Sequence, residues 1–286
     1  MGKKYVIGLD YGTDSVRAVL IEASTGKEIT ADIFEYPRWS QGKYCDPARN
    51  IFRQHPLDQL EGLESTIKNI LNKIRGLEEE IAAISVTTTG STPIAVDKTG
   101  CALALKEKFS ENPNAMFVMW KDHASVKEAD DINRLAKEWG GEDFSIYSGG
   151  IYSSEWFWSK LLHIVREDAL VRNEIGSWVE NCDWIPAVLT GNTSPEKMKR
   201  SRCAAGHKAM WHGSWGGLPS EAFLVKLDPL LTGFRSRLYQ ESLTADQLAG
   251  HLSPEWARKL GLPAGIPIGV GALDAHVGAV GAEIRP

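Results

Sequence analysis

Two aspartates stand at the ends of apolar runs, one near each end of the sequence. Asp10 follows the apolar residues 5–9 and precedes a short turn of small and polar residues, Gly12, Thr13, Asp14 and Ser15. Gly12 allows a ligand to approach the backbone closely, and the N–H and hydroxyl groups of such a turn can hold a phosphate. An aspartate at a strand end can bind Mg²⁺ directly or through waters. The same residue types also favour an ordinary hairpin turn, so the turn by itself leaves both interpretations open.

The second aspartate, Asp274, follows the apolar residues 266–270 and a turn of small residues. A carboxylate at the point where a buried strand opens onto a cleft is held rigidly and is partly desolvated. This suits a general base that takes a proton from a hydroxyl group. The position also suits a helix N-cap, which is a common use of aspartate, and one side chain can serve both roles. The neighbouring His276 is expected to pack in the structure rather than to take part in catalysis.

Two further segments carry side chains that can reach a ligand. Lys208 follows small residues and Gly206, so its ammonium can project into a cleft or lie on the surface, as most lysines do. Trp120 is expected in the core, and Asp122 is expected to cap a helix over residues 122–139. The chain has ten tryptophans. We expect most of them in the core, although an aromatic face also suits the apolar side of a sugar ring.

The elements that must position these residues follow from hydrophobic periodicity. Strands joined by tight turns, an antiparallel meander, are predicted at residues 5–9, 16–21 and 28–36. Apolar residues then recur at three- and four-residue steps from Leu57 to Leu77, which predicts an amphipathic helix with Pro56 in its first turn. A buried strand follows at residues 81–86. This order predicts an α/β fold of ribonuclease-H-like layout, in which a mixed sheet begins as a meander and turns parallel through a crossover helix.

The rest of the chain is predicted to be mainly helical. Ser153, Ser220 and Ser253 are expected to cap helices, and a short helix is expected at residues 184–189. Near the end, a strand at residues 266–270 precedes a helix of small residues that runs to Pro286. The candidate base Asp274 therefore lies between the last strand and the last helix.

Composition and charge exclude several classes of protein. The 286 residues are 43% hydrophobic and 24% charged, which is typical of a globular chain with a sizeable core. A net charge of −5 without a basic run argues against a nucleic acid or an anionic membrane as the main partner. The four cysteines form no C-x-x-C pair, and no apolar stretch reaches spanning length. We therefore expect a cytoplasmic protein with reduced thiols.

Five segments together resemble the FGGY carbohydrate kinases, which belong to the superfamily of actin, sugar kinases and Hsp70. The segments are GLDYGTDSVRAVL (8–20), WKDHA (120–124), SSEWFWSKLLHI (153–164), RCAAGHKAMWH (202–212) and GALDAHVGAVGA (271–282). The middle three are typical of the ribulokinase branch. Other sugar kinases of the family usually have Trp-x-Asp-x-Arg where this chain has Ala124 in the last place, and this departure favours ribulokinase over xylulokinase or glycerol kinase.

The resemblance implies a function for each candidate residue. It implies ATP-dependent phosphorylation of a ketopentose, foremost L-ribulose to L-ribulose 5-phosphate in L-arabinose catabolism, with ATP and Mg²⁺ as cofactors. Asp274 would deprotonate the sugar C5 hydroxyl, and Asp10 would assist Mg²⁺. The turn of Gly12, Thr13, Asp14 and Ser15 would form the phosphate loop. Lys208, the backbone at Gly90 and Trp120 would line the ketose pocket. Two alternatives stay open: another FGGY sugar or polyol kinase of xylulokinase-like specificity, and a non-catalytic sugar-binding module of the same fold.

The resemblance covers the whole chain but only the first of the two domains of this family. We expect residues 1–265 to form the sugar-binding domain. Residues 266–286 are expected to form a strand, turn and helix that carry Asp274 and lead toward a missing nucleotide-binding domain. On this basis the chain is expected to be a fragment that is inactive as a kinase by itself. Its expected partners are a small-molecule ketose and MgATP, and a homo-oligomer is left open.

Overall fold

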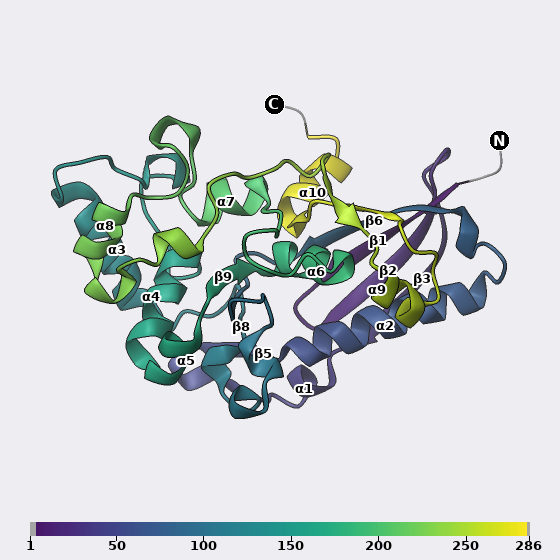
Figure 1. Cartoon of the computed structure of the whole chain (residues 1–286), viewed down its shortest axis with the longest axis horizontal. Coiled ribbons are helices and arrows are strands. Elements are labelled where there is room, and N and C mark those ends of the chain that lie inside the picture. Colours follow the sequence, from purple (N-terminus) through teal and green to yellow (C-terminus); the bar gives the residue numbers. More distant parts are fainter. Residues whose placement is uncertain (1–3, 285–286) are drawn as a thin grey trace.

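The computed structural model describes residues 4–284, which form two halves along the long axis of the molecule (Figure 1). The sheet half comprises residues 5–102, 179–198 and 248–281, and it packs around an aliphatic core. The helical half comprises residues 103–178 and 202–239, and its core is rich in aromatic side chains. Within residues 4–284, no helix combines the length and the apolar character needed to cross a membrane.

The main sheet has seven strands and confirms the predicted mixed topology. Its strands are β1 (Tyr5–Tyr11), β2 (Ser15–Glu22), β3 (Lys27–Glu35), β6 (Ile81–Thr88), β10 (Leu248–His251), β11 (Pro267–Gly269) and β12 (Ala272–Leu273). They are arranged in the order β10-β11-β6-β1-β2-β3, and β12 also pairs with β6. β1 is antiparallel to β2 but parallel to β6, so the meander turns parallel as predicted. The predicted last strand at residues 266–270 is observed as β11, and the predicted turn after it contains the short strand β12; both belong to this sheet.

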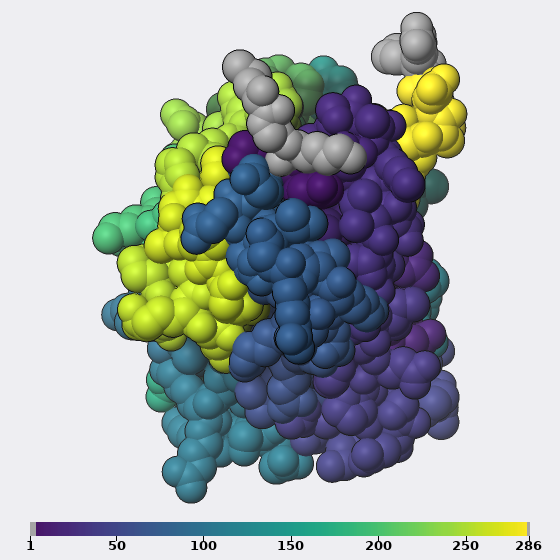
Figure 2. Space-filling model, turned by 90° about the vertical axis from the view of Figure 1, so that its right-hand side faces the viewer, coloured from purple at the N-terminus to yellow at the C-terminus, as the bar shows by residue number. Residues whose placement is uncertain are grey.

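Helix α2 (Pro56–Lys73) makes the crossover and covers one face of the meander. Its buried stripe of Leu63, Ile67 and Ile70 packs against the sheet, as its periodicity predicts. A Cβ atom added at Gly62 would lie 2.4 Å from Cγ1 of Val16, so only glycine allows this close approach of helix and strand. Figure 2 shows the end of α2 and the residues after it (blue) between the first strands (purple) and the segment with α9 (Pro254–Leu260; yellow-green).

The helical half is built from short helices around aromatic side chains. Its helices are α3 (Val126–Glu138), α4 (Phe157–Glu167), α5 (Ala169–Glu174), α7 (Arg202–Lys208) and α8 (Glu221–Leu227). Phe144 is central to the packing, with edge-to-face contacts to Trp215 and Phe223 at centroid distances of 5.3 and 5.1 Å. Trp158 and Trp178 are fully buried. Most tryptophans are therefore in or against a core, as expected, but Trp120 is 39% exposed and the expectation for it is wrong.

The remaining helices and strands lie outside the main sheet and the group of helices above. They are α1 (Pro37–Ser40), β4 (Cys45–Asp46), β5 (Ile51–Gln54), β7 (Pro93–Val96), β8 (Phe117–Val118), β9 (Ser177–Glu180), α6 (Asn181–Thr190) and α10 (Asp274–Gly281). β7 pairs with β9, and β5 pairs with both β4 and β8. α10 is shorter than the predicted last helix, and Pro286 lies outside the described residues.

Several predicted helix starts can be compared with the observed ones. Ser220 and Ser253 cap α8 and α9 through hydrogen bonds from backbone N–H groups two or three residues into the helix, as expected. Asp122 does not cap a helix, because α3 begins at Val126 and Asp122 is instead buried against Arg53. Ser153 does not cap α4 either, since that helix begins at Phe157.

Candidate active site

Asp10 and Asp274 lie on either side of the carboxyl end of β6. Asp10 in β1 is opposite Thr87 of β6, and Ala272 in β12 is opposite the same threonine from the other side. The Thr87 hydroxyl donates a hydrogen bond to the Ala272 carbonyl at 3.3 Å, which fixes β12 beside β6. The carboxyl ends of parallel strands are the usual place for ligands in open α/β sheets. The topology therefore brings the two aspartates, which are 264 positions apart, to one edge.

The two carboxylates interact electrostatically. Partial burial raises the pKa of Asp10, and the nearby negative charge of Asp274 raises it further. The Arg17 guanidinium, across the hairpin from Asp10, opposes both effects on this pKa. A cation between the carboxylates would relieve their repulsion. Within residues 4–284, no group of three or more His, Cys, Asp or Glu side chains could hold a metal ion, so these residues would supply at most two such ligands here.

Asp274 is the first residue of α10 rather than its N-cap. The N-cap position is Leu273, whose side chain provides no cap. One carboxylate oxygen of Asp274 accepts a hydrogen bond from the Ala275 N–H at 2.6 Å. Its other oxygen has no hydrogen-bond partner among residues 4–284. The side chain is therefore oriented by its own helix and keeps one oxygen available for a proton.

The hairpin between β1 and β2 presents unused backbone donors. The Gly12 N–H donates to the Ser15 carbonyl at 2.9 Å and closes the turn, so it is not free for a ligand. The N–H groups of Thr13 and Asp14 have no hydrogen-bond partner within the described part of the chain. Two adjacent free N–H groups on a tight turn form a suitable cradle for an anion.

Three side chains from other segments hold this hairpin in place. The indole N–H of Trp120 donates to the Thr13 hydroxyl at 2.9 Å, and the Gln54 amide donates to the Thr13 carbonyl at 3.0 Å. The Trp39 indole N–H donates to the Asp14 carboxylate at 2.6 Å. Trp120 is therefore a contact of the phosphate-loop candidate, which explains why it is not in the core.

Gly90 lies at the end of β6 and packs against the residue before Asp274. A Cβ atom at Gly90 would be 2.1 Å from Cδ2 of Leu273, so a larger residue would force the buried side chain before Asp274 to shift. The Thr89 N–H also donates to the Tyr11 carbonyl at 3.0 Å, which links this loop to the end of β1. The loop that contains Gly90 is thus joined to both strands that carry an aspartate.

Lys160 is a buried cation behind this loop that the sequence did not single out. Its ammonium donates to the carbonyls of Ser91 and Met119 at 2.7 and 2.8 Å, and to a third carbonyl at 3.3 Å. Glu180 lies nearby and accepts hydrogen bonds from the Ser91 hydroxyl and the Thr92 N–H. Burial lowers the pKa of Lys160 and raises the pKa of Glu180. The only sequence signal is a lysine among the apolar residues of α4.

Lys208 ends α7 and lies within electrostatic reach of Asp274. Its side chain is 8% exposed, and its ammonium lies 5.1 Å from the ring centroid of Trp156. Burial lowers the pKa of Lys208, while the carboxylates of Glu180, Glu155 and Asp274 act in the opposite direction on this pKa. No hydrogen bond or ion pair to this ammonium occurs among residues 4–284. A largely buried lysine whose ammonium has no protein acceptor is partly desolvated, and a ligand oxygen would supply the missing hydrogen bond. Trp156 and Glu155 lie in the segment 153–164, which is typical of the ribulokinase branch, but neither was predicted as a site residue.

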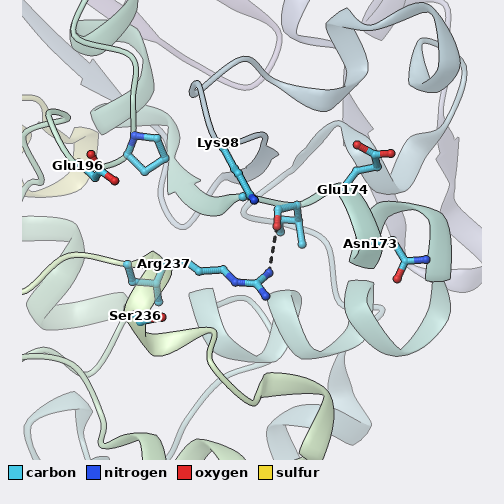
Figure 3. A pocket seen from close by; sticks show the side chains of 10 residues that line it. Lys98, Asn173, Glu174, Glu196, Ser236 and Arg237 are labelled. Carbon is cyan, nitrogen blue, oxygen red and sulfur yellow. Dashed lines mark hydrogen bonds between the residues drawn. The ribbon is translucent and has the colours of Figure 1, made fainter.

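A cavity of about 440 Å³ lies elsewhere and shares no residue with this cluster. Figure 3 shows its lining, in which Arg237 donates a hydrogen bond to the Ile175 carbonyl at 3.2 Å. Lys98 and Arg237 face it together with Glu174 and Glu196, so its charge favours no single class of ligand. The strand-end cluster, which contains Asp10, Gly90, Trp120, Lys208 and Asp274 and the turn at residues 12–15, is therefore the candidate active site.

Comparison with known proteins gives a consistent result. A profile of the FGGY family of carbohydrate kinases, N-terminal domain, matches residues 5–281. The chain is 51% identical to a ribulokinase of Vibrio parahaemolyticus over 281 residues, which is 98% of this chain and 50% of that protein. It is 37% identical to a ribulokinase of Halalkalibacterium halodurans, covering 96% of this chain and 49% of that protein. The chain thus spans about half the length of the curated relatives it matches.

Solved structures share the fold at low sequence identity. A xylulose kinase from Rhodospirillum rubrum superimposes with a TM-score of 0.77 at 19% identity, over 99% of this chain and 51% of that one. A glycerol kinase from Plasmodium falciparum, solved with ADP, gives a TM-score of 0.74 at 13% identity over 99% of this chain and 51% of that one. These similarities establish the sugar-kinase fold.

Proposed function

This chain belongs to the FGGY family of carbohydrate kinases, and on that premise we propose that it is the sugar-binding half of an ATP-dependent ketopentose kinase. The preferred substrate is L-ribulose, and the product is L-ribulose 5-phosphate. One observation carries the proposal: Asp274, with a free carboxylate oxygen, lies within electrostatic reach of Lys208, a largely buried lysine whose ammonium lacks an acceptor among residues 4–284. A polyhydroxylated substrate between them would meet a proton acceptor on one side and a charged donor on the other.

Each side chain has a distinct part in this reaction. Lys208 donates a hydrogen bond to a ketose oxygen, and the Trp156 ring covers one side of the ammonium. The backbone at Gly90 contributes polar contacts beside Leu273. Asp274 takes the proton of the C5 hydroxyl as that oxygen attacks the γ-phosphorus of ATP, and ADP leaves with the electron pair of the broken P–O bond. Such a transfer depends on positioning and charge neutralisation rather than on a protein nucleophile.

The residues around Asp10 fit Mg²⁺ and phosphate. Asp10 has a raised pKa next to Asp274, and a divalent cation would remove the repulsion that contributes to this shift. One or two carboxylates together with waters and phosphate oxygens form a common Mg²⁺ site. When bound, Mg²⁺ neutralises charge on the phosphate oxygens of ATP. The N–H groups of Thr13 and Asp14 would hold a phosphate at the same edge.

The remaining assignments also belong to the proposal. The relatives are about twice as long as this chain, and their second half would supply the other contacts to ATP. Production of L-ribulose 5-phosphate would place the reaction in L-arabinose catabolism in the cytoplasm. The partners are a ketose and MgATP, without nucleic acid or membrane, and self-association is left to experiment.

A coupled assay of ADP release tests the reaction in a full-length kinase that carries this chain. We expect the highest kcat/KM for L-ribulose among L-ribulose, D-ribulose, D-xylulose and glycerol. A preference for D-xylulose would support a xylulokinase-like enzyme instead, as the fold alone allows. Absence of turnover with every sugar, combined with ketose binding by the 286-residue chain in calorimetry, would support a non-catalytic binding module.

A further inference from the structure

Helix α10, which begins at Asp274, is weakly anchored along its length. None of its residues is buried, and Val280 is 75% exposed. The N-cap residue Leu273 provides no side-chain hydrogen bond to the first turn. A base that must meet a hydroxyl at a defined point needs a fixed position. Among residues 4–284, the contacts that can fix Asp274 are therefore those at the start of α10.

Cys203 in α7 contacts the chain on both sides of Asp274. Its sulfur accepts a hydrogen bond from the backbone N–H of Leu273 at 3.4 Å and lies 2.6 Å from Nδ1 of His276. These two residues are the one before Asp274 and the second one after it. His276, which was expected to pack, is exposed and reaches the sulfur from the first turn of α10. One sulfur atom thus connects α7 to both flanks of the aspartate.

The protonation state of the thiol suits this bridging role. Partial burial raises the pKa of Cys203, because a thiolate would be poorly solvated there. A thiol that keeps its proton can donate it to Nδ1 of a neutral imidazole while its lone pairs accept the Leu273 N–H. A protonated thiol is also a poor nucleophile. The chemistry of Cys203 therefore favours holding over covalent catalysis.

Two further contacts join the same helices. The rings of His276 and His207 are stacked, with centroids 5.6 Å apart and an interplanar angle of 20°. The Leu273 side chain is buried in a small cluster with Cys182 and Ala204, the second of which follows Cys203 in α7. α7 also carries Lys208. The same helix therefore sets the distance between the Lys208 ammonium and the Asp274 carboxylate.

We propose that Cys203 is a positioning residue for Asp274: its sulfur holds the start of α10 against α7 and so fixes the carboxylate relative to Lys208. The inference rests on the proposed function, in which Asp274 is the base. Loss of the sulfur would leave the ketose contacts intact but would let the carboxylate move. The chemical step should therefore suffer more than substrate binding.

The test compares Cys203→Ala and Cys203→Ser in the full-length kinase, with Cys101→Ser as the matched control. Cys101 is also half-buried, but its thiol donates a hydrogen bond to the carbonyl of the next residue, Ala102, and so does not join two distant segments. We expect Cys203→Ala to lower kcat roughly 10- to 100-fold with KM for the ketose within about two-fold. Cys203→Ser should recover most of kcat, since a hydroxyl can make both hydrogen bonds. Cys101→Ser should match the parent enzyme.

Two results would overturn the inference. A normal kcat in Cys203→Ala, with only a lower melting temperature, would mean that the sulfur merely packs. Equal losses of kcat in the Ala and Ser variants would mean that the hydrogen bonds of this side chain do not fix the position of Asp274. Asp274→Asn separates this inference from the proposed function. If Asp274→Asn abolishes turnover while Cys203→Ala does not affect it, the function stands and the positioning role fails; if Asp274→Asn turns over normally, the function itself fails.

Discussion

The sheet half and the helical half bring opposite charges to the candidate site. The sheet half places Asp10 at the end of β1, where the ladder of backbone hydrogen bonds fixes its position, and Asp274 directly after β12, at the start of α10. The helical half places the ammonium groups of Lys160 and Lys208 among backbone carbonyls and an aromatic ring. Asp10 needs only the regular sheet, whereas a buried cation such as Lys160 needs a pocket assembled from several segments.

This difference predicts different consequences of mutation. Changes at the strand ends should act on the chemical step, because these residues meet the reacting atoms in the proposed reaction. Changes at the cations of the helical half should act on stability or on ketose binding, because these cations hold loops and face the sugar. Cys203 in α7 differs from them, because it acts on the chemical step through the position of Asp274. Variants in each half test whether the two halves act on these different properties.

The largest effect is expected for Asp274→Asn in the full-length kinase. The amide keeps a similar shape and can still accept a hydrogen bond from the Ala275 N–H, but it cannot accept the hydroxyl proton. We expect kcat to fall by roughly 10²- to 10⁴-fold, which is the usual contribution of a positioned general base, with little change in KM. Steady-state kinetics with L-ribulose check this. A near-normal kcat would falsify the assignment of the base.

Lys160→Met should be the most destabilising change in the helical half. It removes the ammonium that donates to the Ser91, Val118 and Met119 carbonyls, and it removes the positive charge of Lys160 from the surroundings of the buried Glu180 carboxylate. Removal of one partner from such a group costs roughly 3–5 kcal/mol of the free energy of unfolding. Urea unfolding of the 286-residue chain measures it. The control is Lys68→Met, an exposed lysine paired with Glu64, which should cost no more than about 0.5 kcal/mol. Similar losses in the two variants would contradict the role of Lys160.

Lys208→Ala should weaken ketose binding while leaving chemistry largely intact. A charge-assisted hydrogen bond is worth on the order of 1.5–3 kcal/mol, so KM should rise roughly 10- to 100-fold. The exposed Lys98, which faces the separate cavity of Figure 3, provides the control Lys98→Ala. An unchanged KM in Lys208→Ala would show that the ammonium does not contact the sugar. A fall in kcat alone would break the division between the halves.

The smallest effect concerns His207 and pH. Burial, together with the charges of Lys208 and His276, lowers the pKa of His207 to about 4 from an ordinary value near 6.5. Between these values the unfolded chain binds a proton that the folded chain does not, so this group makes stability fall as pH falls from about 6.5 to 4. In His207→Gln, unfolding should take up fewer protons in this pH range, by less than one proton per molecule. The free energy of unfolding should therefore fall less steeply as the pH falls. Urea unfolding at several pH values tests this, and parallel curves for both proteins would refute it.

The sequence by itself determined the regular elements of this protein. Hydrophobic periodicity predicted the meander, the helix from Pro56 and the parallel strand after it, because burial of one face imposes that period locally. Ser220 and Ser253 were identified as caps because a cap contacts residues only two or three positions away. The candidate residues of the site came from strand ends and from the resemblance to a family.

Only the tertiary structure decided which polar side chains meet. Asp122 has a good local capping signal, yet its carboxylate is bound by Arg53, 69 positions away, so the predicted helix began too early. Lys160, Cys203 and the contact between Trp120 and Thr13 have no local pattern that distinguishes them. The physical reason is that a periodic apolar face is a property of one segment. The partner of a buried charge or thiol is set by whichever distant segment folds against it, and no spacing in the sequence records that choice.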